Sequence, residues 1–234
     1  MKQQLLAFAR HLLASALCAG AVGAASATAV FSNATSIYGA GNGGNYVLTV
    51  SDATPGSLQW TLDVQPWNAE VLALFVDFGT VTMPSSIGLS HTSPSGAITL
   101  FARDTSSSSC GSGCNLNGLA LPALGGGDWE LVFRLGDSGF QGIQSWNWTT
   151  SDFGLDAADI RLIGIRAQQL CSAGQTLPDG SCGGSDKAFA WPNPAPQNLV
   201  PTGGIAGNVA SPGTATLALG ALAAAAWLRR RRRR

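Results

Sequence analysis

Residues 58–65 alternate strictly between apolar and polar side chains, and this pattern restricts the fold of the chain more than any other feature. Every second position is apolar: Leu58, Trp60, Leu62 and Val64. A period of two places these side chains on one face of a β-strand and their polar neighbours on the other. The chain is also rich in Gly, Ser, Thr and Asn and poor in the long charged residues that solvent-facing helices need. We therefore expect an all-β fold.

Six further segments have the character of strands. Residues 70–78 are almost uniformly apolar, which is typical of a central strand covered on both faces. Residues 188–191 precede Pro192 and predict an edge strand. The remaining segments are residues 46–50, 97–103, 129–135 and 160–166. Turns rich in Gly, Ser and Pro separate them, so the pattern predicts a single antiparallel β-sandwich, jelly-roll-like, over residues 28–191.

Two local details follow from the same patterns. Residues 31–44 are small, polar and rich in glycine, and they predict a flexible lead-in to the first strand. In residues 129–135 the alternation places Trp129 on the same face as Leu131, Phe133 and Leu135.

The first 27 residues have the pattern of a secretory signal peptide. Lys2 and Arg10 supply positive charge, and residues 12–22 form a short apolar run. Ala25-Ser26-Ala27 supplies the small residues of a cleavage site. We expect removal of residues 1–27 by cleavage after Ala27.

Residues 209–234 have the three parts of a sorting signal. A short motif comes first, and residues 215–228 then carry no charge. Fourteen helical residues span about 21 Å, less than the ~30 Å hydrocarbon core, so this helix predicts a transient membrane anchor. The chain ends in a basic cluster of Arg229, Arg230, Arg231, Arg232, Arg233 and Arg234, which favours a cytoplasmic position. Residues 192–208, rich in Pro, Gly and Asn, predict an extended linker.

This tail resembles the PEP-CTERM sorting domain of Gram-negative bacteria. The matching motif residues are Val209, Pro212, Gly213 and Thr214, whereas Ala210 and Ser211 stand where the family has Pro and Glu. The resemblance implies processing by an exosortase, a transpeptidase-like membrane enzyme, in an organism that makes extracellular polysaccharide. It also implies an inner-membrane-anchored precursor that is then delivered to the cell surface or released.

The second half of the chain also resembles the β-sandwich body of PEP-CTERM proteins. In that body a strand ends in a His/Arg–x–Gln unit, and a closing strand follows near Ser-x-Lys. Arg166-Ala167-Gln168 and Ser185-Asp186-Lys187 are the matching residues.

The region between the two targeting ends is acidic. It holds five basic residues and all thirteen acidic residues of the chain, which gives a net charge of −8. Such a surface repels the phosphate backbone, so we expect no nucleic-acid partner.

Four cysteines remain once the signal peptide is removed: Cys110, Cys114, Cys171 and Cys182. An even number in an exported chain predicts disulfides, and three pairings are formally open. We favour Cys110–Cys114 with Cys171–Cys182, because each pair brackets a Gly/Ser-rich loop. Zinc is the alternative, but the spacing is not C-x-x-C and His91 is remote in sequence. We therefore expect neither a metal nor another cofactor.

Catalytic signals are sparse. The sequence has no Gly-x-Ser-x-Gly elbow and no His-Glu-x-x-His helix, and His91 is expected in an exposed loop. Nothing in the sequence brings Glu70 and Glu130 together as a glycosidase pair. Loop aspartates are candidates for calcium, with solvated turns as the default: Asp152, Asp156, Asp159, Asp179 and Asp186. We expect a protein without enzymatic activity.

Trp146 and Trp148 are the candidates for glycan binding, because one intervening residue would place both rings on the same face of a strand. Packing in the core is the alternative, and the apolar neighbours favour it. The sequence as a whole favours an exported, sorted surface or extracellular-matrix protein with a structural or interaction role. The alternative is a carbohydrate-binding module for exopolysaccharide.

Overall fold

The computed structural model describes residues 27–32, 37–39, 43–137, 139–172, 174–177 and 182–191. The expected signal peptide up to Ser26, the linker 192–208 and the sorting tail 209–234 lie outside these residues. Within the described ranges, no helical segment has the length and apolar character of a membrane span.

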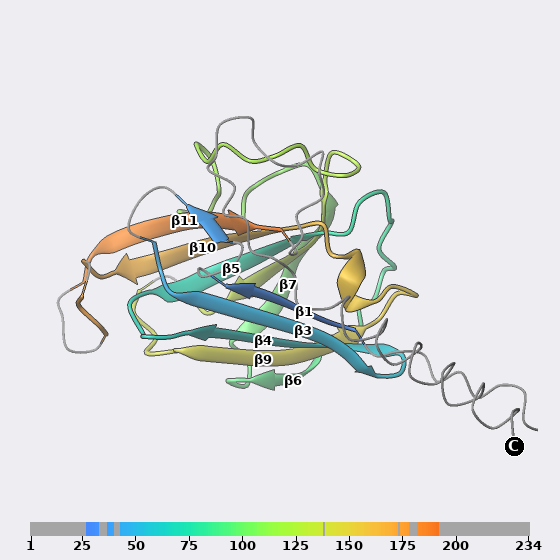
Figure 1. The fold of residues 1–234 in the computed structure, drawn as a ribbon, viewed down its shortest axis with the longest axis horizontal. Helices are drawn as coiled ribbons and strands as arrows, with labels where there is room; N and C mark the ends of the chain where they lie inside the picture. The colour runs from blue at the N-terminus through green and yellow to red at the C-terminus, as the bar shows by residue number, and fades with distance from the viewer. Residues whose placement is uncertain are drawn as a thin grey trace, which may run out of the picture.

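The described chain is all-β and forms two antiparallel sheets (Figure 1). Sheet A has the strand order β1-β3-β4-β9-β6 and consists of β1 (Thr28–Ser32), β3 (Tyr46–Thr54), β4 (Ser57–Val64), β9 (Ser145–Ser151) and β6 (Ser90–Ser93). Sheet B has the order β2-β11-β10-β5-β8-β7 and consists of β2 (Ile37–Gly39), β11 (Gly184–Ala190), β10 (Leu162–Leu170), β5 (Glu70–Asp77), β8 (Trp129–Leu135) and β7 (Ile98–Thr105). A single 3-10 turn, η1 (Ala157–Asp159), precedes β10.

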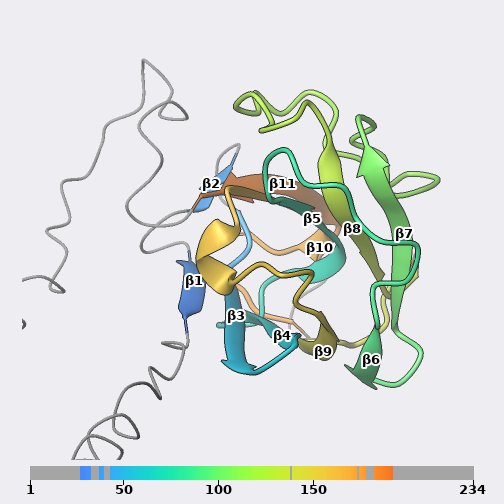
Figure 2. The same cartoon turned by 90° about the vertical axis from the view of Figure 1, so that its right-hand side faces the viewer.

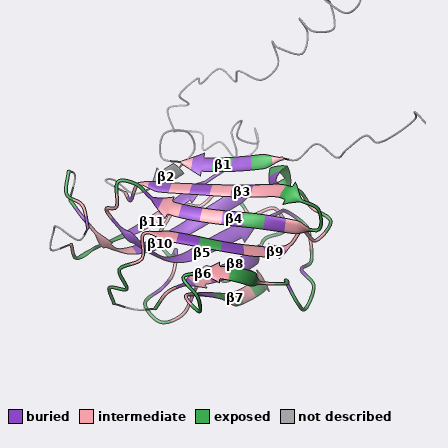
Figure 3. Ribbon diagram, turned by 90° about the horizontal axis from the view of Figure 1, so that it is seen from below, coloured by how far each residue is buried: buried purple, intermediate pink, exposed green. Residues whose placement is uncertain are grey.

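The two sheets share one main core between their inner faces (Figure 2). Strands β3, β4 and β9 bury every second side chain there, as the alternation in the sequence predicts. Figure 3 shows this alternation of buried and more exposed positions along β3 and β4. Leu74 and Ile163 are among the side chains that sheet B contributes to the same core.

Strand β5 is buried along its whole length, which confirms the prediction of a central strand. Its inner side chains face sheet A, and Phe75 on the other side belongs to a second apolar cluster. Residues 106–128, here called the covering segment, supply Cys110, Cys114 and Leu116 to that cluster. Sheet B is therefore covered on both faces.

The structure corrects three expectations. Residues 31–44 are not simply a flexible lead-in, because they include the end of β1 and all of β2, which pair with β3 and β11. Strand β11 is not an edge strand, since β2 lies outside it. Trp129 does not face the main core with Leu131, and it packs against Phe75 in the second cluster.

Candidate functional site

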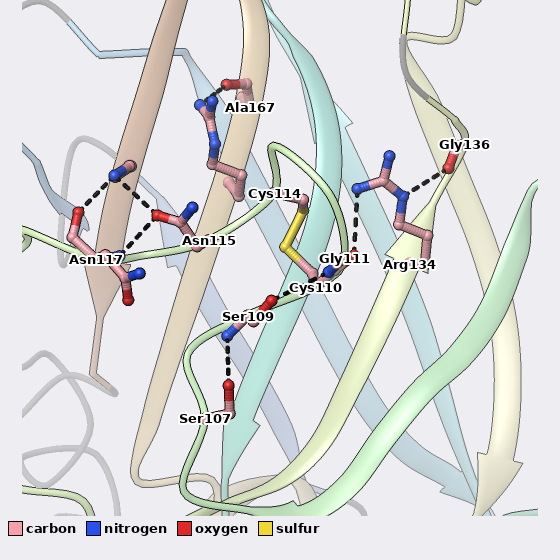
Figure 4. The surroundings of a disulfide bond; sticks show 12 residues. Ser107, Ser109, Cys110, Gly111, Cys114, Asn115, Asn117, Arg134, Gly136 and Ala167 are labelled. Atoms are coloured by element: carbon pink, nitrogen blue, oxygen red, sulfur yellow. Dashed lines mark hydrogen bonds between the residues drawn. A yellow bond between two sulfur atoms is a disulfide. The ribbon is translucent and has the colours of Figure 1, made fainter.

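Both expected disulfides are present. Cys110 is bonded to Cys114, and Cys171 is bonded to Cys182. The first bond lies within the covering segment (Figure 4), and both of its cysteines are fully buried. Arg134 Nη1 donates to the carbonyl oxygen of Cys110 at 3.5 Å and so ties this loop to β8. Disulfides persist in oxidising compartments, so the pair of bonds indicates an extracytoplasmic environment.

The outer face of sheet A has no comparable cover among the described residues. We call it the bare face, and it consists of the outward side chains of the five strands. Cross-strand register arranges these side chains in rows. One row is Thr28, Ser51, Gln59, Thr149 and Ser90, and the next is Val30, Thr49, Thr61, Asn147 and Ser93. Strands lie ~4.8 Å apart and alternate residues ~6.8 Å apart, so hydroxyl and amide groups recur on a regular lattice.

The bare face is polar with almost no charge. Asp63 is its one acidic side chain, and none of its described strand positions is Lys or Arg. Its groups bond to one another across strands: Thr61 Oγ1 and Asn147 Oδ1 lie 2.9 Å apart, and Ser90 Oγ and Thr149 Oγ1 lie 2.8 Å apart. A hydroxyl both donates and accepts, so such a face suits an uncharged ligand rich in hydroxyl groups.

An open groove of about 520 Å³ lies at one end of the bare face. We call it the hydroxyl groove, because Ser57, Ser90, Thr149 and Ser151 line it together with His91. The volume is within the range of small-molecule sites. The groove is wide open to solvent and shallow, which suits part of an extended ligand better than an enclosed small molecule.

His91 is exposed, as expected, but it belongs to strand β6 and not to a loop. Its φ of 50° lies in the left-handed region, which is uncommon for residues other than glycine. Nδ1 lies 3.2 Å from Ser90 Oγ and 3.1 Å from Thr149 Oγ1. These contacts fix the ring over the groove. Its described hydrogen-bond partners are hydroxyls, without the carboxylate that orients the imidazole in a catalytic triad.

Trp146 and Trp148 do lie on one face of β9, but that face is the inner one. Their exposed fractions are 0% and 1%. Trp148 stacks on Trp60, with ring centroids 5.7 Å apart and planes 4° apart. Neither Nε1 of Trp146 nor that of Trp148 has a hydrogen-bond partner among the described residues. The glycan-platform interpretation is therefore wrong for these two rings in this fold, because no sugar can reach them.

Glu70 is a buried carboxylate with a structural role. It accepts hydrogen bonds from the backbone N–H groups of Gln141 and Ile143, at 2.9 and 3.1 Å, and from Gln168 Nε2 at 3.3 Å. These bonds fasten the loop before β9 to sheet B. Glu130 lies on β8 beside the far end of β5, where it accepts from the N–H of Phe78. Roughly 25 Å of strand separates the two glutamates, so they do not form a glycosidase pair.

Glu130 and Asp77 are adjacent in the ladder of β5 and β8, one step beyond Val76 and Leu131. Both are fully buried. Asp77 accepts from the N–H groups of Gly79 and Gly125 at 2.6 and 2.9 Å, whereas Glu130 Oε1 has no partner among the described residues. Burial, together with the nearby charge of Asp77, raises the pKa of Glu130 to about 7. Burial also raises the pKa of Asp77.

The two short motifs that resemble the PEP-CTERM body lie side by side. Arg166 is opposite Lys187 and Gln168 is opposite Ser185 in the pairing of β10 with β11. Lys187 Nζ donates to Asn115 Oδ1 at 3.2 Å and to the carbonyl of Asn117, which ties the covering segment to β11 (Figure 4). Gln168 bonds the carbonyl of Gly139 as well as Glu70. These residues hold loops onto sheet B.

The described loop aspartates cap local structure. Asp152 accepts from the N–H of Gly154, and Asp156 and Asp159 form a capping box around η1. Asp186 is not in a loop, contrary to expectation, but is buried in β11, where it accepts from Gly44 N–H and from Tyr46 Oη–H at 2.8 and 2.9 Å. Asp179 lies outside the described residues. Where the structure describes the chain, no three His, Cys, Asp or Glu side chains converge as a metal site.

No protein-family model, curated protein or solved structure matches this chain. The candidate site therefore rests on its own geometry. Sequence analysis missed the bare face, because its polar residues were treated only as the solvent side of each strand. The available signal was the near-absence of Lys, Glu and Arg from those positions, which ordinary solvent-facing strands carry.

Proposed function

We propose that this protein is exported and sorted to the cell surface or the extracellular matrix, where it has a structural or interaction role. The observation that carries the proposal is the pairing of a signal-peptide pattern in residues 1–27 with the three-part tail of residues 209–234. The PEP-CTERM resemblance of that tail makes an exosortase-like enzyme the processing partner. In this proposal the tail anchors the precursor transiently in the inner membrane.

The folded domain supports this proposal through its chemistry. Two disulfides suit an oxidising compartment. Strands successive in the sequence cross between the two sheets at β1 to β2, β2 to β3, β4 to β5, β5 to β6, β6 to β7, β8 to β9 and β9 to β10, which supports the jelly-roll-like description that we propose for the domain. The outer face of sheet B is covered by residues 106–128, whereas the outer face of sheet A is the bare face. A regular, uncovered face of this kind suits a protein that acts by contact and not by catalysis.

The second candidate is a carbohydrate-binding module for exopolysaccharide. The specific observation in its favour is the bare face with its hydroxyl groove, since rows of Thr, Ser, Asn and Gln side chains match the hydroxyls of a neutral glycan chain. The binding residues in this proposal are on the outer face of β4 and β9, and the buried tryptophans have no part in it.

Cell fractionation and intact-mass analysis test the export proposal. We expect the disulfide-bonded protein at the cell surface or in the medium, without its signal peptide and without the six terminal arginines. Deletion of residues 229–234 is the matched variant, and we expect it to accumulate in the membrane fraction. Recovery of the unprocessed, full-length chain from the cytoplasm would overturn the proposal.

Affinity electrophoresis in gels that contain the organism's own exopolysaccharide tests the second candidate. The double variant Thr61→Val with Thr149→Val removes two hydroxyls from the bare face and keeps the side-chain shape. We expect it to lose the retardation of the parent protein. Thr99→Val on β7 of sheet B is the matched control and should keep it. Equal retardation of all three proteins would exclude the bare face as the glycan site and leave the export proposal untouched.

A further inference from the structure

The first described residue, Ala27, is held by a carboxylate. Its N–H donates to Asp52 Oδ1 at 2.5 Å, and the N–H of Asp52 donates back to the carbonyl of Ala27 at 3.2 Å. The two residues continue the ladder of β1 and β3 one step beyond the pair Thr28 and Ser51. An antiparallel pair at this position normally exchanges two backbone bonds. Here the side chain of Asp52 takes the place of one backbone acceptor.

The same carboxylate also reaches η1. Asp52 Oδ2 accepts from the N–H of Ala157 at 3.3 Å, so one half-buried side chain joins β1, β3 and η1. In the described part of the chain no basic side chain forms an ion pair with Asp52. The side chains of Arg103, Arg134, Arg166 and Lys187 donate to backbone carbonyls and to an amide oxygen elsewhere in the domain. Among the described residues the negative charge of Asp52 is thus met by two amide groups and by no cation.

We propose that Asp52 is the receptor for the mature N-terminus of the protein, and that this N-terminus is the α-ammonium group of Ala27. The inference rests on the proposed export. It places signal-peptide cleavage at the Ser26–Ala27 bond, one residue before the position that the sequence pattern favours. Ala24 and Ser26 then supply the small residues that cleavage requires at the third and first positions before the bond. Cleavage after Ala27 would remove the donor that Asp52 holds.

The chemistry is a peptide hydrolysis by the signal peptidase of the export pathway. One water molecule is consumed, and the Ser26–Ala27 C–N bond breaks. The carbonyl carbon of Ser26 gains the hydroxyl and leaves as a carboxylate. The nitrogen of Ala27 gains protons and becomes an ammonium at neutral pH. A neutral amide donor becomes a charged donor at the same nitrogen, 2.5 Å from the carboxylate, and charge-assisted hydrogen bonds are the stronger kind.

The proposal has a defined pH dependence. An unperturbed α-amino group has a pKa of about 7.7–8.0, and an ion pair with a carboxylate raises it. While the Asp52 carboxylate is ionised, the stabilisation is therefore complete below about pH 8 and is lost as the pH rises through the folded-state value. The charged groups on the elements that meet here are Asp52 on β3 and, at η1, Asp156 and Asp159, whose carboxylates accept backbone N–H groups in the capping box.

The first experiment is mass spectrometry of the N-terminal peptide of the exported protein. We expect it to begin Ala27-Thr28-Ala29. A peptide that begins at Thr28 or any other residue would overturn this inference while export stands. A chain that still begins at Met1 would overturn the export proposal itself.

The second experiment tests the ion pair on the purified exported protein. Acetic anhydride at about pH 6.5 acetylates the α-amine in preference to Lys187, because the α-amine has the lower pKa. We expect acetylation to lower the Tm by about 2–4 °C at pH 6 in the parent protein and by much less in Asp52→Asn. Asp63→Asn on the bare face is the matched control and should respond like the parent. An equal loss in all three proteins would overturn the inference.

Discussion

Trp148 has two aromatic contacts in the core, one with each of the two sheets. It stacks on Trp60, and Phe133 meets it edge-on with ring centroids 5.3 Å apart. Trp60 in turn donates its Nε1–H to Thr150 Oγ1 at 3.0 Å. The stack joins β4 and β9 of sheet A to β8 of sheet B. These rings therefore hold the two sheets together.

We predict that Trp148→Ala lowers the free energy of unfolding by about 3–5 kcal/mol, because it opens a large cavity between the sheets. Asn147→Ala changes the exposed neighbour on the same strand, and we expect it to cost less than about 1 kcal/mol. Urea denaturation followed by Trp fluorescence measures both. Similar costs for the two variants would contradict the core position of Trp148.

Glu130 gives the stability of the domain a pH dependence with a defined sign. Its pKa rises from 4.5 in the unfolded chain to about 7 in the folded domain, chiefly through burial. Between these values the folded state keeps a proton that the unfolded chain releases. The contribution of Glu130 is therefore complete below about pH 4.5 and falls by about 3 kcal/mol as the pH rises to 7. The shift of Asp77 has the same direction.

We predict that Glu130→Gln is more stable than the parent protein at pH 8 and has a flatter profile of Tm between pH 4.5 and 7. Gln keeps an oxygen acceptor for the N–H of Phe78 and carries no charge to bury. Thermal unfolding over this pH range is the measurement, with Asp63→Asn as the control that should follow the parent. A parallel profile for Glu130→Gln would contradict the buried, charged state of Glu130 at high pH.

For individual residues, the alternation in the sequence predicts which side chains face the core. It does not predict the positions, such as Trp129, where a side chain departs from the alternation. Trp60, Trp146 and Trp148 occupy the inner face that a period of two requires. Trp129 breaks the pattern because the covering segment gives the outer side of sheet B an apolar cluster of its own. The burial of Glu130 also depends on that segment, which is 20 or so residues without strand periodicity.

The two disulfides act on elements of different kinds. Cys110–Cys114 closes a turn inside the covering segment, whereas Cys171–Cys182 joins the end of β10 to the approach to β11. Their sequence separations are 4 and 11 residues. A cross-link removes more freedom from the unfolded chain when it closes a longer loop.

We predict that the double variant Cys171→Ala with Cys182→Ala loses about 3 kcal/mol, and that Cys110→Ala with Cys114→Ala loses about 2 kcal/mol. Urea denaturation of both variants under the same oxidising conditions gives the comparison. A larger loss of stability for the Cys110 and Cys114 variant would mean that the packing of these buried cysteines within the covering segment contributes more than loop closure does.

Strands with a strong apolar pattern of their own were predictable from the sequence. Strands that form only because another strand pairs with them were not. Strands β3, β4, β5 and β8 carry their own apolar periodicity. Strand β6 reads Ser-His-Thr-Ser and has no apolar residue, so it is a strand only because β9 pairs with it. Strand β2 has three residues and depends on β11, which is about 150 positions away in the chain. Sequence windows contain no information about such partners.

The whole domain is acidic, because residues 28–208 hold five basic and thirteen acidic residues, a net charge of −8. Like charges on one compact body repel, and salt shortens the range of that repulsion from about 30 Å at 0.01 M to about 8 Å at 0.15 M. We predict that the Tm rises by about 2 °C over this interval of NaCl concentration, equivalent to less than ~1 kcal/mol. A fall in Tm would show that attractive ion pairs dominate the electrostatics of the fold.

The candidate site is a property of the whole sheet. Thr49, Thr61 and Asn147 belong to three strands that are far apart in the sequence, and only the cross-strand register puts them in one row. The composition of each strand was visible in the sequence, whereas the register and the covering of the other sheet were not. For this reason the sequence predicts the tryptophans as the glycan-binding candidates. The structure instead makes the small polar side chains of the bare face the candidates.

The strand order of sheet B determines when the chain can fold during synthesis. The strand beside β2 is β11, and β10 lies between β11 and the central strand β5. A growing or partly translocated chain therefore holds β2 and β5 long before the strands that join them exist. Contacts of such long range form late and slowly. Sheet B therefore cannot be completed until residues up to 190 are free, and in the export that we propose this delay leaves the chain without its complete fold during passage through the membrane.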